Sequence, residues 1–583
     1  YNGIMSTMNY NHTSALGALL GGHFIGAGKA MADGRFGLEM FPMRLWAWYD
    51  GTTQESIDHY YFSHTLTAQK MFVDFAPTAF DRMIGESILA KSIEELAACY
   101  HPALRRFVST SGRTGIAYVL AINEGVGSIV HTLSPNGALT DLGGQPVAGI
   151  PVVGKDFPPG HVAEQAMHSP WGPAWTAELL DAKPLPFAMT ASFKQWGSFV
   201  DPVKWKQSWL GRRYGVASYD CAMGTVQQMA VWNRNPAPAT TATDIGLLTV
   251  RFGFNRTNML DTLHLSPKDG KPNANGILGE QGGATACLQH RGTMLVLSSP
   301  YAGLASTADL KPTAQPITSI QTTVMLATVQ AEPSWRIVVD GKPAGPLPLT
   351  LQASSRIAID DGGVFIGLVP IPATVLGARD AEVVIRTGGP PVKLQGGGEL
   401  SERLLIESYH YRSDQPFDLA GAAPGGLDRA SGGFVILAAD DSEGDFTAFQ
   451  RRLAAGTLSD AWDEAKGLRS LAWKDGADLM EVGYLPVHGT EPKPTEVFAH
   501  RRVNGAWPYL APGMERETTV SAMGRTGRLE KHGAVLRHQP GTMGYLLVMP
   551  GSGALRFANP LPDLAWQRFS GPGGLTVEAV RAT

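Results

Sequence analysis

The stretch Trp205–Trp232, WKQSWLGRRYGVASYDCAMGTVQQMAVW, marks the point at which the chain changes from helix-like to strand-like sequence. It contains no run of Ser, Pro and Gly of the kind that forms a flexible linker. Domains joined without such a linker are usually fixed relative to one another. We therefore predict a helical domain that passes directly into β structure.

Upstream of this join, apolar residues recur at helical spacing in three segments. Asn11 and Thr13 could cap the first helix, although several glycines interrupt its pattern. Pro77 stops the second helix and Pro102 stops the third, because proline cannot continue a helix. The pattern predicts helices over residues 13–31, 53–75 and 78–100.

Downstream of the join, short apolar runs alternate with Gly, Pro, Asn and Asp, which is typical of strands and turns. The pair Asp340-Gly341 is a hairpin signal. Helical patterns interrupt the strands near residues 445–454 and 458–465. Strands are predicted over residues 246–252, 293–298, 335–339 and 364–370.

The chain of 583 residues is too long for a single core, and its 68 glycines and 40 prolines favour many turns. We predict a multidomain α+β protein in which antiparallel β domains follow a helical domain. The expected boundaries are residues 1–205 for the helical catalytic domain, 206–400 for a β-sandwich and 401–583 for a C-terminal β-rich domain.

Charge, cysteine content and hydropathy limit the partners. Charged residues make up 17% and the net charge is −4, so the composition gives no reason to expect nucleic-acid binding. No apolar run reaches the roughly 18 residues of a membrane span. Three cysteines in no metal-binding spacing favour buried free thiols over one disulfide. The chain begins at Tyr1, as a processed secretory protein would, so we expect a periplasmic or secreted location.

The first candidate motif is Asn9-Tyr10-Asn11-His12. Two amides and an imidazole at the positive end of a helix suit a carboxylate or another anion. A capping Asn beside a solvent-facing His is the stronger interpretation when this motif is taken alone.

The second candidate motif is WAWYDGTTQESIDHYYFSH at residues 46–64. Trp faces stack on the C–H surfaces of sugar rings. Residues four apart share a helix face, which pairs Glu55 with His59 and Tyr60 with His64. A buried aromatic helix with satisfied polar tips explains the same residues equally well. The candidate substrate-binding residues here are Trp46, Trp48, Glu55, His59, Tyr61 and His64.

Together, Asn-His at one helix start and Asp-Gly-x-x-x-Glu-Ser-x-x-x-Tyr at the next resemble the heparinase II/III-like and alginate-lyase superfamily of polysaccharide lyases. The stretch Trp209–Ser218, followed by Gln227-Gln228 and Trp232, resembles its join between helices and first sheet. The resemblance implies an (α/α) toroid backed by antiparallel β-sheet domains. A closed ring needs more helices than residues 1–205 can supply, so we expect either an incomplete ring or a chain that starts partway through its toroid.

The resemblance also implies β-elimination beside the carboxylate of a uronic acid. The C5 proton is weakly acidic, so hydrogen-bond donors or positive charge must first neutralise that carboxylate. Asn11 and His12 match the family's neutralising and base positions, and Tyr60 matches the tyrosine that removes the C5 proton, protonates the leaving oxygen, or does both. The expected substrate is an anionic polysaccharide such as alginate, glucuronan or a glycosaminoglycan.

Further candidates are weaker. Arg212 and Arg213, with Tyr214, could bind the carboxylate through paired hydrogen bonds, or the arginines could only pair with acids at a domain interface. No convincing motif surrounds His264 or His290, so a second catalytic histidine is not identified.

We expect no cofactor. The acidic run at residues 440–445 could hold a structural divalent cation such as calcium, but it lacks EF-hand spacing, and a solvated loop is favoured.

Two other functions remain open. A glycoside hydrolase on an (α/α) toroid would use two carboxylates across a cleft, and Asp50, Glu55 and Asp58 could supply them. A non-catalytic glycan-binding protein would keep the aromatic helix and lack a working base. A lyase leaves a C4–C5 double bond that absorbs ultraviolet light, a hydrolase leaves none, and a binding protein makes no new chain ends.

Overall fold

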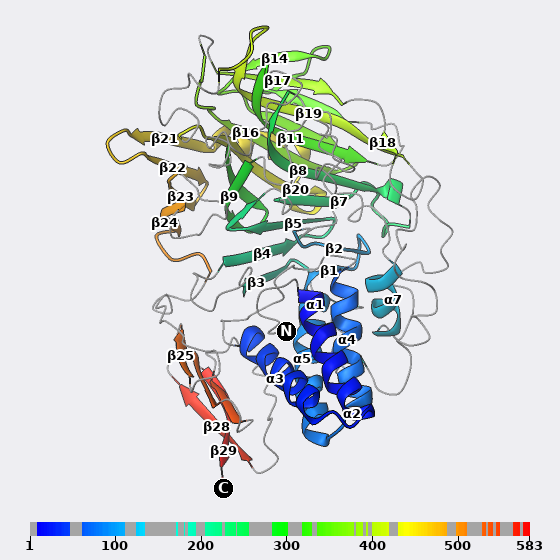
Figure 1. Ribbon diagram of the computed structural model, residues 1–583. Coiled ribbons are helices and arrows are strands. Elements are labelled where there is room, and N and C mark those ends of the chain that lie inside the picture. The colour runs from blue at the N-terminus through cyan, green and yellow to red at the C-terminus, as the bar shows by residue number, and fades with distance from the viewer. Residues whose placement is uncertain are drawn as a thin grey trace.

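The protein is an antiparallel β-rich, multidomain chain with a helical layer at its N-terminal end (Figure 1). The computed structural model describes residues 8–46, 61–110, 124–133, 171–172, 180, 183, 185–193, 204–223, 228–240, 242–255, 283–300, 317–328, 335–377, 381–388, 392–393, 399–418, 429–486, 497–509, 527–531, 534–539, 544–548, 564–571 and 575–582.

The helical layer contains α1 (Met8–Leu16), a π-turn (Gly17–Gly21), α2 (Gly22–Phe24), α3 (Gly28–Trp46), α4 (Tyr61–Phe75), α5 (Ala79–Cys99) and α7 (Glu124–Leu133). The start of α5 was predicted, and it is capped by Thr78, whose side chain accepts a hydrogen bond from the Asp81 amide. The end of α4 before Pro77 was also predicted. Among the described residues, these helices do not close a ring.

The single helix predicted over residues 13–31 is wrong. The chain is already helical at Met8, so Asn11 and Thr13 lie inside α1 and do not cap it. The glycines explain the difference. Gly26 has φ +69°, which ends α2 and reverses the chain into α3. At Gly34 of α3, a Cβ atom would lie 2.3 Å from the backbone nitrogen of Leu19, so only glycine allows α3 to pack this closely.

Two large sheets follow. The first has the order β14-β17-β19-β11-β8-β7-β5-β4-β3, with β18 paired to β19. Its strands are β3 (Phe187–Phe193), β4 (Lys204–Leu210), β5 (Tyr214–Tyr219), β7 (Met229–Asn233), β8 (Ile245–Phe254), β11 (Ser319–Thr328), β14 (Leu349–Gln352), β17 (Glu382–Thr387), β18 (Val392–Lys393) and β19 (Glu399–Arg412).

The second sheet has the order β13-β12-β15-β16-β20-β10-β9-β6. Its strands are β6 (Cys221–Met223), β9 (Gly283–His290), β10 (Thr293–Pro300), β12 (Arg336–Val339), β13 (Lys342–Pro343), β15 (Ile357–Asp361), β16 (Val364–Ile371) and β20 (Gly432–Asp440). Asp340 and Gly341, both with positive φ, form the predicted hairpin between β12 and β13.

The two sheets pack face to face as a sandwich, with Trp232, Leu248 and Ile406 of the first sheet sharing one core with Ile366 and Ile436 of the second. The sandwich includes β19 and β20, so the boundary predicted at residue 400 falls inside it. It also includes β3, which begins before the boundary predicted at residue 205.

The outer face of the second sheet is also covered. Helix α10 (Phe446–Ala455) and a four-stranded sheet pack on it through a second core that contains Phe365, Phe449 and Trp473. The strands of this smaller sheet are β21 (Thr457–Asp463), β22 (Leu468–Asp475), β23 (Asp478–Tyr484) and β24 (Phe498–Val503). Burial on both faces explains why β10, β16 and β20 are almost continuously apolar.

The prediction of a helix over residues 458–465 is wrong, because most of this segment is β21, an edge strand paired with β22. Helix α10 ends at Gly456, where a Cβ atom would lie 2.3 Å from the Trp473 ring, and the chain leaves it in an extended conformation.

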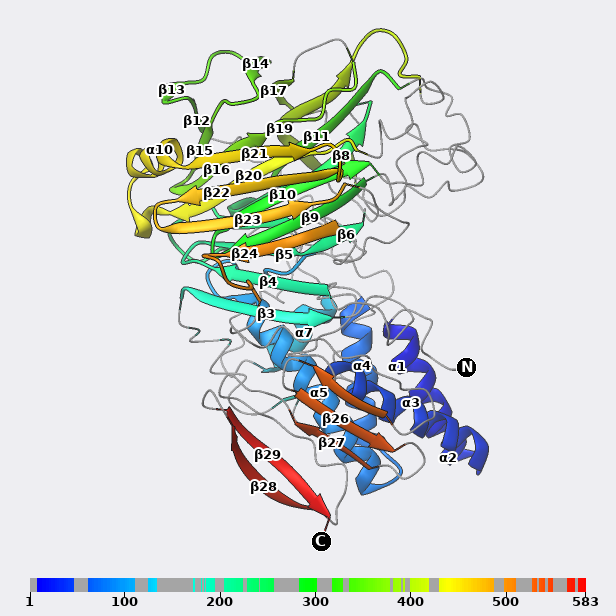
Figure 2. The same cartoon turned by 90° about the vertical axis from the view of Figure 1, so that its left-hand side faces the viewer.

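Smaller antiparallel pairs complete the fold. A two-stranded pair, β1 (Tyr100–His101) and β2 (Arg106–Phe107), follows α5. The C-terminal strands lie on the helical side of the molecule (Figures 1 and 2). They are β25 (Gly527–Lys531), β26 (Ala534–Gln539), β27 (Gly544–Val548), β28 (Leu564–Gly571) and β29 (Leu575–Ala582).

Candidate functional site

The helix that carries the first motif packs beside the helix that follows the second, since α1 lies against α4 (Figure 1). His12 of α1 is fully buried. Its ring stacks on Phe41 of α3, with centroids 3.7 Å apart, and its Nε2 atom lies 3.1 Å from the Gln69 side-chain nitrogen of α4. The two side chains are within hydrogen-bond distance. His12 therefore joins three helices.

Asn11 is 3% exposed, so both members of the pair face the protein interior. Gln69 lies eight residues beyond Tyr61, which corresponds to roughly 12 Å of helix rise. His12 thus meets α4 about two turns below its first residue. A group that touches a sugar must reach a cleft surface, and a fully buried imidazole does not.

The remaining residues of the second motif are placed only in part. Tyr60 and the candidate binding residues Trp48, Glu55 and His59 lie outside the described residues, as do Asp50 and Asp58. Trp46 ends α3 and Tyr61 begins α4, but their side chains lie outside the described residues. His64 is half-buried in the first turn of α4.

The two neighbouring arginines at the join, Arg212 and Arg213, have different surroundings. Arg212 is exposed. Arg213 is 7% exposed and pairs with Asp441 at 2.9 Å, and it also donates to the carbonyl oxygens of Gly362 and Asn233. These contacts hold the sandwich together. They fit the interpretation in which Arg213 pairs with an acid of the protein and does not bind a substrate carboxylate.

A buried ion pair ties the helical layer to the first large sheet. Lys206 of β4 contacts Glu95 of α5, and the two side chains are 3% and 2% exposed. Burial, the largest single cause, lowers the pKa of Lys206, but Glu95 together with Tyr219 and Cys99 outweighs it, so the net shift is upward. Loss of one partner would leave the other charge buried and would strongly destabilise the folded protein. This contact therefore fixes the orientation of α5 on the sheet.

A second buried lysine closes the C-terminal end of α5. Lys183 donates hydrogen bonds to the carbonyl oxygens of Ala97, Ala98 and Tyr100 at 2.5, 2.9 and 2.5 Å. The last carbonyl groups of a helix have no partner within the helix. A cation at this end also interacts favourably with the helix dipole. Burial lowers the pKa of Lys183 to about 7. The helical layer is therefore anchored where it meets the sheets.

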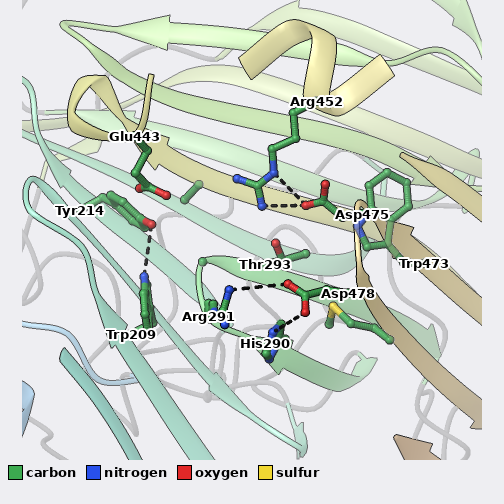
Figure 3. A pocket seen from close by; sticks show the side chains of 13 residues that line it. Trp209, Tyr214, His290, Arg291, Thr293, Glu443, Arg452, Trp473, Asp475 and Asp478 are labelled. Atoms are coloured by element: carbon green, nitrogen blue, oxygen red, sulfur yellow. Dashed lines mark hydrogen bonds and ion pairs between the residues drawn. The ribbon is translucent and has the colours of Figure 1, made fainter. Parts of the chain in front are cut away.

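A polar pocket of about 280 Å³ lies between the sandwich and the four-stranded sheet (Figure 3). The sandwich contributes Trp209 of β4, Tyr214 of β5 and the β9–β10 turn from His290 to Thr293. Trp209 Nε1 donates to the Tyr214 hydroxyl at 3.2 Å. Burial raises the pKa of the Tyr214 phenol, which stays protonated and is hydrogen-bonded to Glu443.

The opposite wall comes from α10, β22 and β23. Arg452 of α10 donates to Asp475 from Nε at 2.8 Å and pairs with it through Nη2 at 2.6 Å. Asp478 accepts a hydrogen bond from Asn504 at 3.0 Å and lies 3.4 Å from His290 Nε2. Burial lowers the pKa of His290, although Asp478 opposes that shift.

His290 and the acidic run 440–445 stand out in the sequence, but nothing there links them to Asp475 and Asp478. Two tight turns carry His290, Asp475 and Asp478: the β9–β10 turn, with Arg291 at φ +52°, and the β22–β23 turn, with Gly476 at φ +61°. The turns have a local sequence signal. Their convergence does not, because they belong to different sheets.

Within the described ranges, no group of three or more His, Cys, Asp or Glu side chains is arranged to hold a metal ion. None of the described helices is both long and apolar enough to cross a membrane.

No protein-family model matches the chain. A search of curated proteins also found no match.

Proposed function

We propose that this protein is a polysaccharide lyase that cleaves a uronic-acid-containing polysaccharide by β-elimination. One observation supports this proposal above the others: α1, which carries Asn11 and His12, packs directly against α4, which begins one residue after Tyr60. The two motifs are nearly fifty residues apart in the chain, and the fold brings their helices together. We propose that the helical layer is part of an (α/α) toroid.

In the proposed reaction, Tyr60 is the proton-transfer residue. The C5–H bond of the uronate breaks and its proton passes to the base. The electron pair forms the C4–C5 double bond as the C4–O4 bond breaks. The leaving oxygen takes a proton and becomes a hydroxyl group. No water is consumed, so the two products together have the mass of the substrate.

Asn11 and His12 are both buried, so we propose that the pair supports the site from behind and does not touch the substrate. The uronate carboxylate must then be neutralised by another donor, which lowers the cost of removing the C5 proton. His12 is proposed as a positioning residue, because it holds α1 against α4 through Gln69. Arg212, which is exposed, is the remaining basic candidate at the join.

The aromatic segment before α4 is proposed to hold the polymer. Trp46 and Trp48 would stack on sugar rings, and Glu55, His59, Tyr61 and His64 would bind hydroxyl groups. The proposed partner is an anionic polysaccharide, the proposed location is periplasmic or extracellular, and no cofactor is required.

Ultraviolet absorbance of the unsaturated product tests the proposal. The whole protein is incubated with alginate, glucuronan, hyaluronan, chondroitin and heparan. We expect absorbance to rise with at least one polymer. Tyr60→Phe removes a single hydroxyl group and should lower turnover at least ~10²-fold, the usual scale for an acid–base residue.

Tyr411→Phe is the matched control, because the Tyr411 hydroxyl only donates to the Gln415 carbonyl oxygen in the sandwich. It should keep full activity. New reducing ends without absorbance would instead support hydrolysis, and a loss of those ends in Glu55→Gln would identify its carboxylate. Full activity of Tyr60→Phe would remove Tyr60 from the mechanism.

A further inference from the structure

We propose that the pocket between the sandwich and the four-stranded sheet binds one neutral, hydroxyl-rich sugar ring. The pocket is formed entirely by the β part of the chain, with no lining residue from the helical layer. This binding site is therefore separate from the proposed catalytic site, and the proposal does not depend on lyase activity.

The charges of the pocket argue for a neutral ligand. Two arginines and three carboxylates line it, and Asp475 already holds Arg452. Arg291 lies 3.6 Å from Asp478. An anionic sugar would add a fourth negative charge without finding an uncommitted cation, which is unfavourable at these distances. A uronate ring is thus disfavoured here, in contrast to the catalytic site.

The hydrogen-bonding groups of the pocket are complementary to sugar hydroxyls. Asp475 and Asp478 can accept hydrogen bonds, and their side chains are 14% and 34% exposed. Arg452 and Arg291 can donate, and their side chains are 41% and 63% exposed. A sugar hydroxyl can donate to one of these carboxylates and accept from one of these arginines at once.

The volume of the pocket limits the size of the ligand. A volume of about 280 Å³ lies at the low end of the roughly 300–1,000 Å³ range of ligand pockets, which suits one ring and not a chain of rings. Trp209, which is half-buried, supplies an aromatic wall on which the C–H face of a pyranose can stack. Polar groups opposite an aromatic wall are the usual arrangement of a sugar-binding site.

Ligand-observed NMR with methyl glycosides of glucose, galactose and mannose tests this proposal, with methyl glucuronide as the charged counterpart. We expect at least one neutral glycoside to bind with a Kd of about 1 mM, as expected for about a dozen non-hydrogen atoms. The glucuronide should bind at least ~10-fold more weakly. Asp478→Asn should weaken binding at least ~10-fold.

Asp463→Asn is the matched control, since its side chain is 38% exposed against 34% for Asp478 and lies outside the pocket. It should bind normally. Trp209→Leu is a second variant that removes the stacking surface, and it too should weaken binding. Tyr60→Phe should bind the glycoside like the parent protein, which separates this site from the catalytic one.

Three outcomes would overturn the proposal. The parent protein could bind no neutral glycoside, which would leave water as the occupant. The glucuronide could bind as well as the neutral sugars. Asp478→Asn and Trp209→Leu could both bind like the parent, which would place the sugar elsewhere.

Discussion

Replacement of Lys206 by Met tests how the helical layer is held on the sheet. The change leaves the Glu95 carboxylate buried without its cation, since the two side chains are only 3% and 2% exposed. Loss of one partner from a buried pair typically costs about 3–5 kcal/mol. We expect a loss of this size in Lys206→Met and in Glu95→Met.

The double variant separates this pair from general packing. With both residues replaced by Met, no charge remains buried, and stability should return to within about 1 kcal/mol of the parent. The cycle should therefore give a coupling free energy of at least about 5 kcal/mol. Lys466→Met is the control, because Lys466 pairs with Asp463 at the surface, and it should leave the unfolding midpoint unchanged.

The assay is urea unfolding followed by tryptophan fluorescence, with the midpoint shift taken from the transition that involves α5 and β4. The pKa of Lys206 is raised above its usual value, so the stabilisation by this pair is fully present below about pH 10. It should be lost only as the pH rises through the higher, folded-state pKa. Single variants within about 1 kcal/mol of the parent would refute a buried pair between the two layers.

Two other properties follow from the packing. Burial raises the pKa of the Cys99 thiol to about 11 and also raises the pKa of the Cys287 thiol. In a Cys221→Ser background, neither thiol should therefore react with a thiol reagent until the protein unfolds. Rapid labelling of the native protein would contradict this. A Cβ atom at Gly433 would lie 1.9 Å from the Val296 carbonyl oxygen, so Gly433→Ala should lower the free energy of unfolding in urea by at least about 2 kcal/mol. Gly345→Ala is the control and should cost little, because a Cβ atom there meets no atom within 4 Å. Equal effects of the two variants would refute the close strand contact.

Local signals in the sequence predicted the elements whose ends are set by single residues. Pro77 and Thr78 determine the end of α4 and the start of α5, and Asp340-Gly341 determines a hairpin, because each acts through its own backbone. The error at residues 458–465 has a different cause: β21 is exposed and is held as a strand by pairing with β22. A periodicity argument does not include that pairing.

The candidate sites also differ in how far local sequence can reveal them. The motifs around Asn11 and Tyr60 are contiguous in the chain, so a resemblance could identify them. The burial of His12 depends on Phe41 and Gln69, which reach it from two other helices. The β pocket depends on two turns from different sheets, and neither turn resembles a binding motif alone. Only the fold brings those residues together.

Cleavage in water enriched in oxygen-18 tests the central claim most directly. The polymer that gives the largest ultraviolet signal is digested, and the fragments are weighed by mass spectrometry. A lyase breaks the C4–O4 bond without consuming water, so the fragments should carry an unsaturated end and no heavy oxygen at the new termini. Saturated fragments, each pair heavier by one molecule of labelled water, would show hydrolysis and contradict the proposed β-elimination.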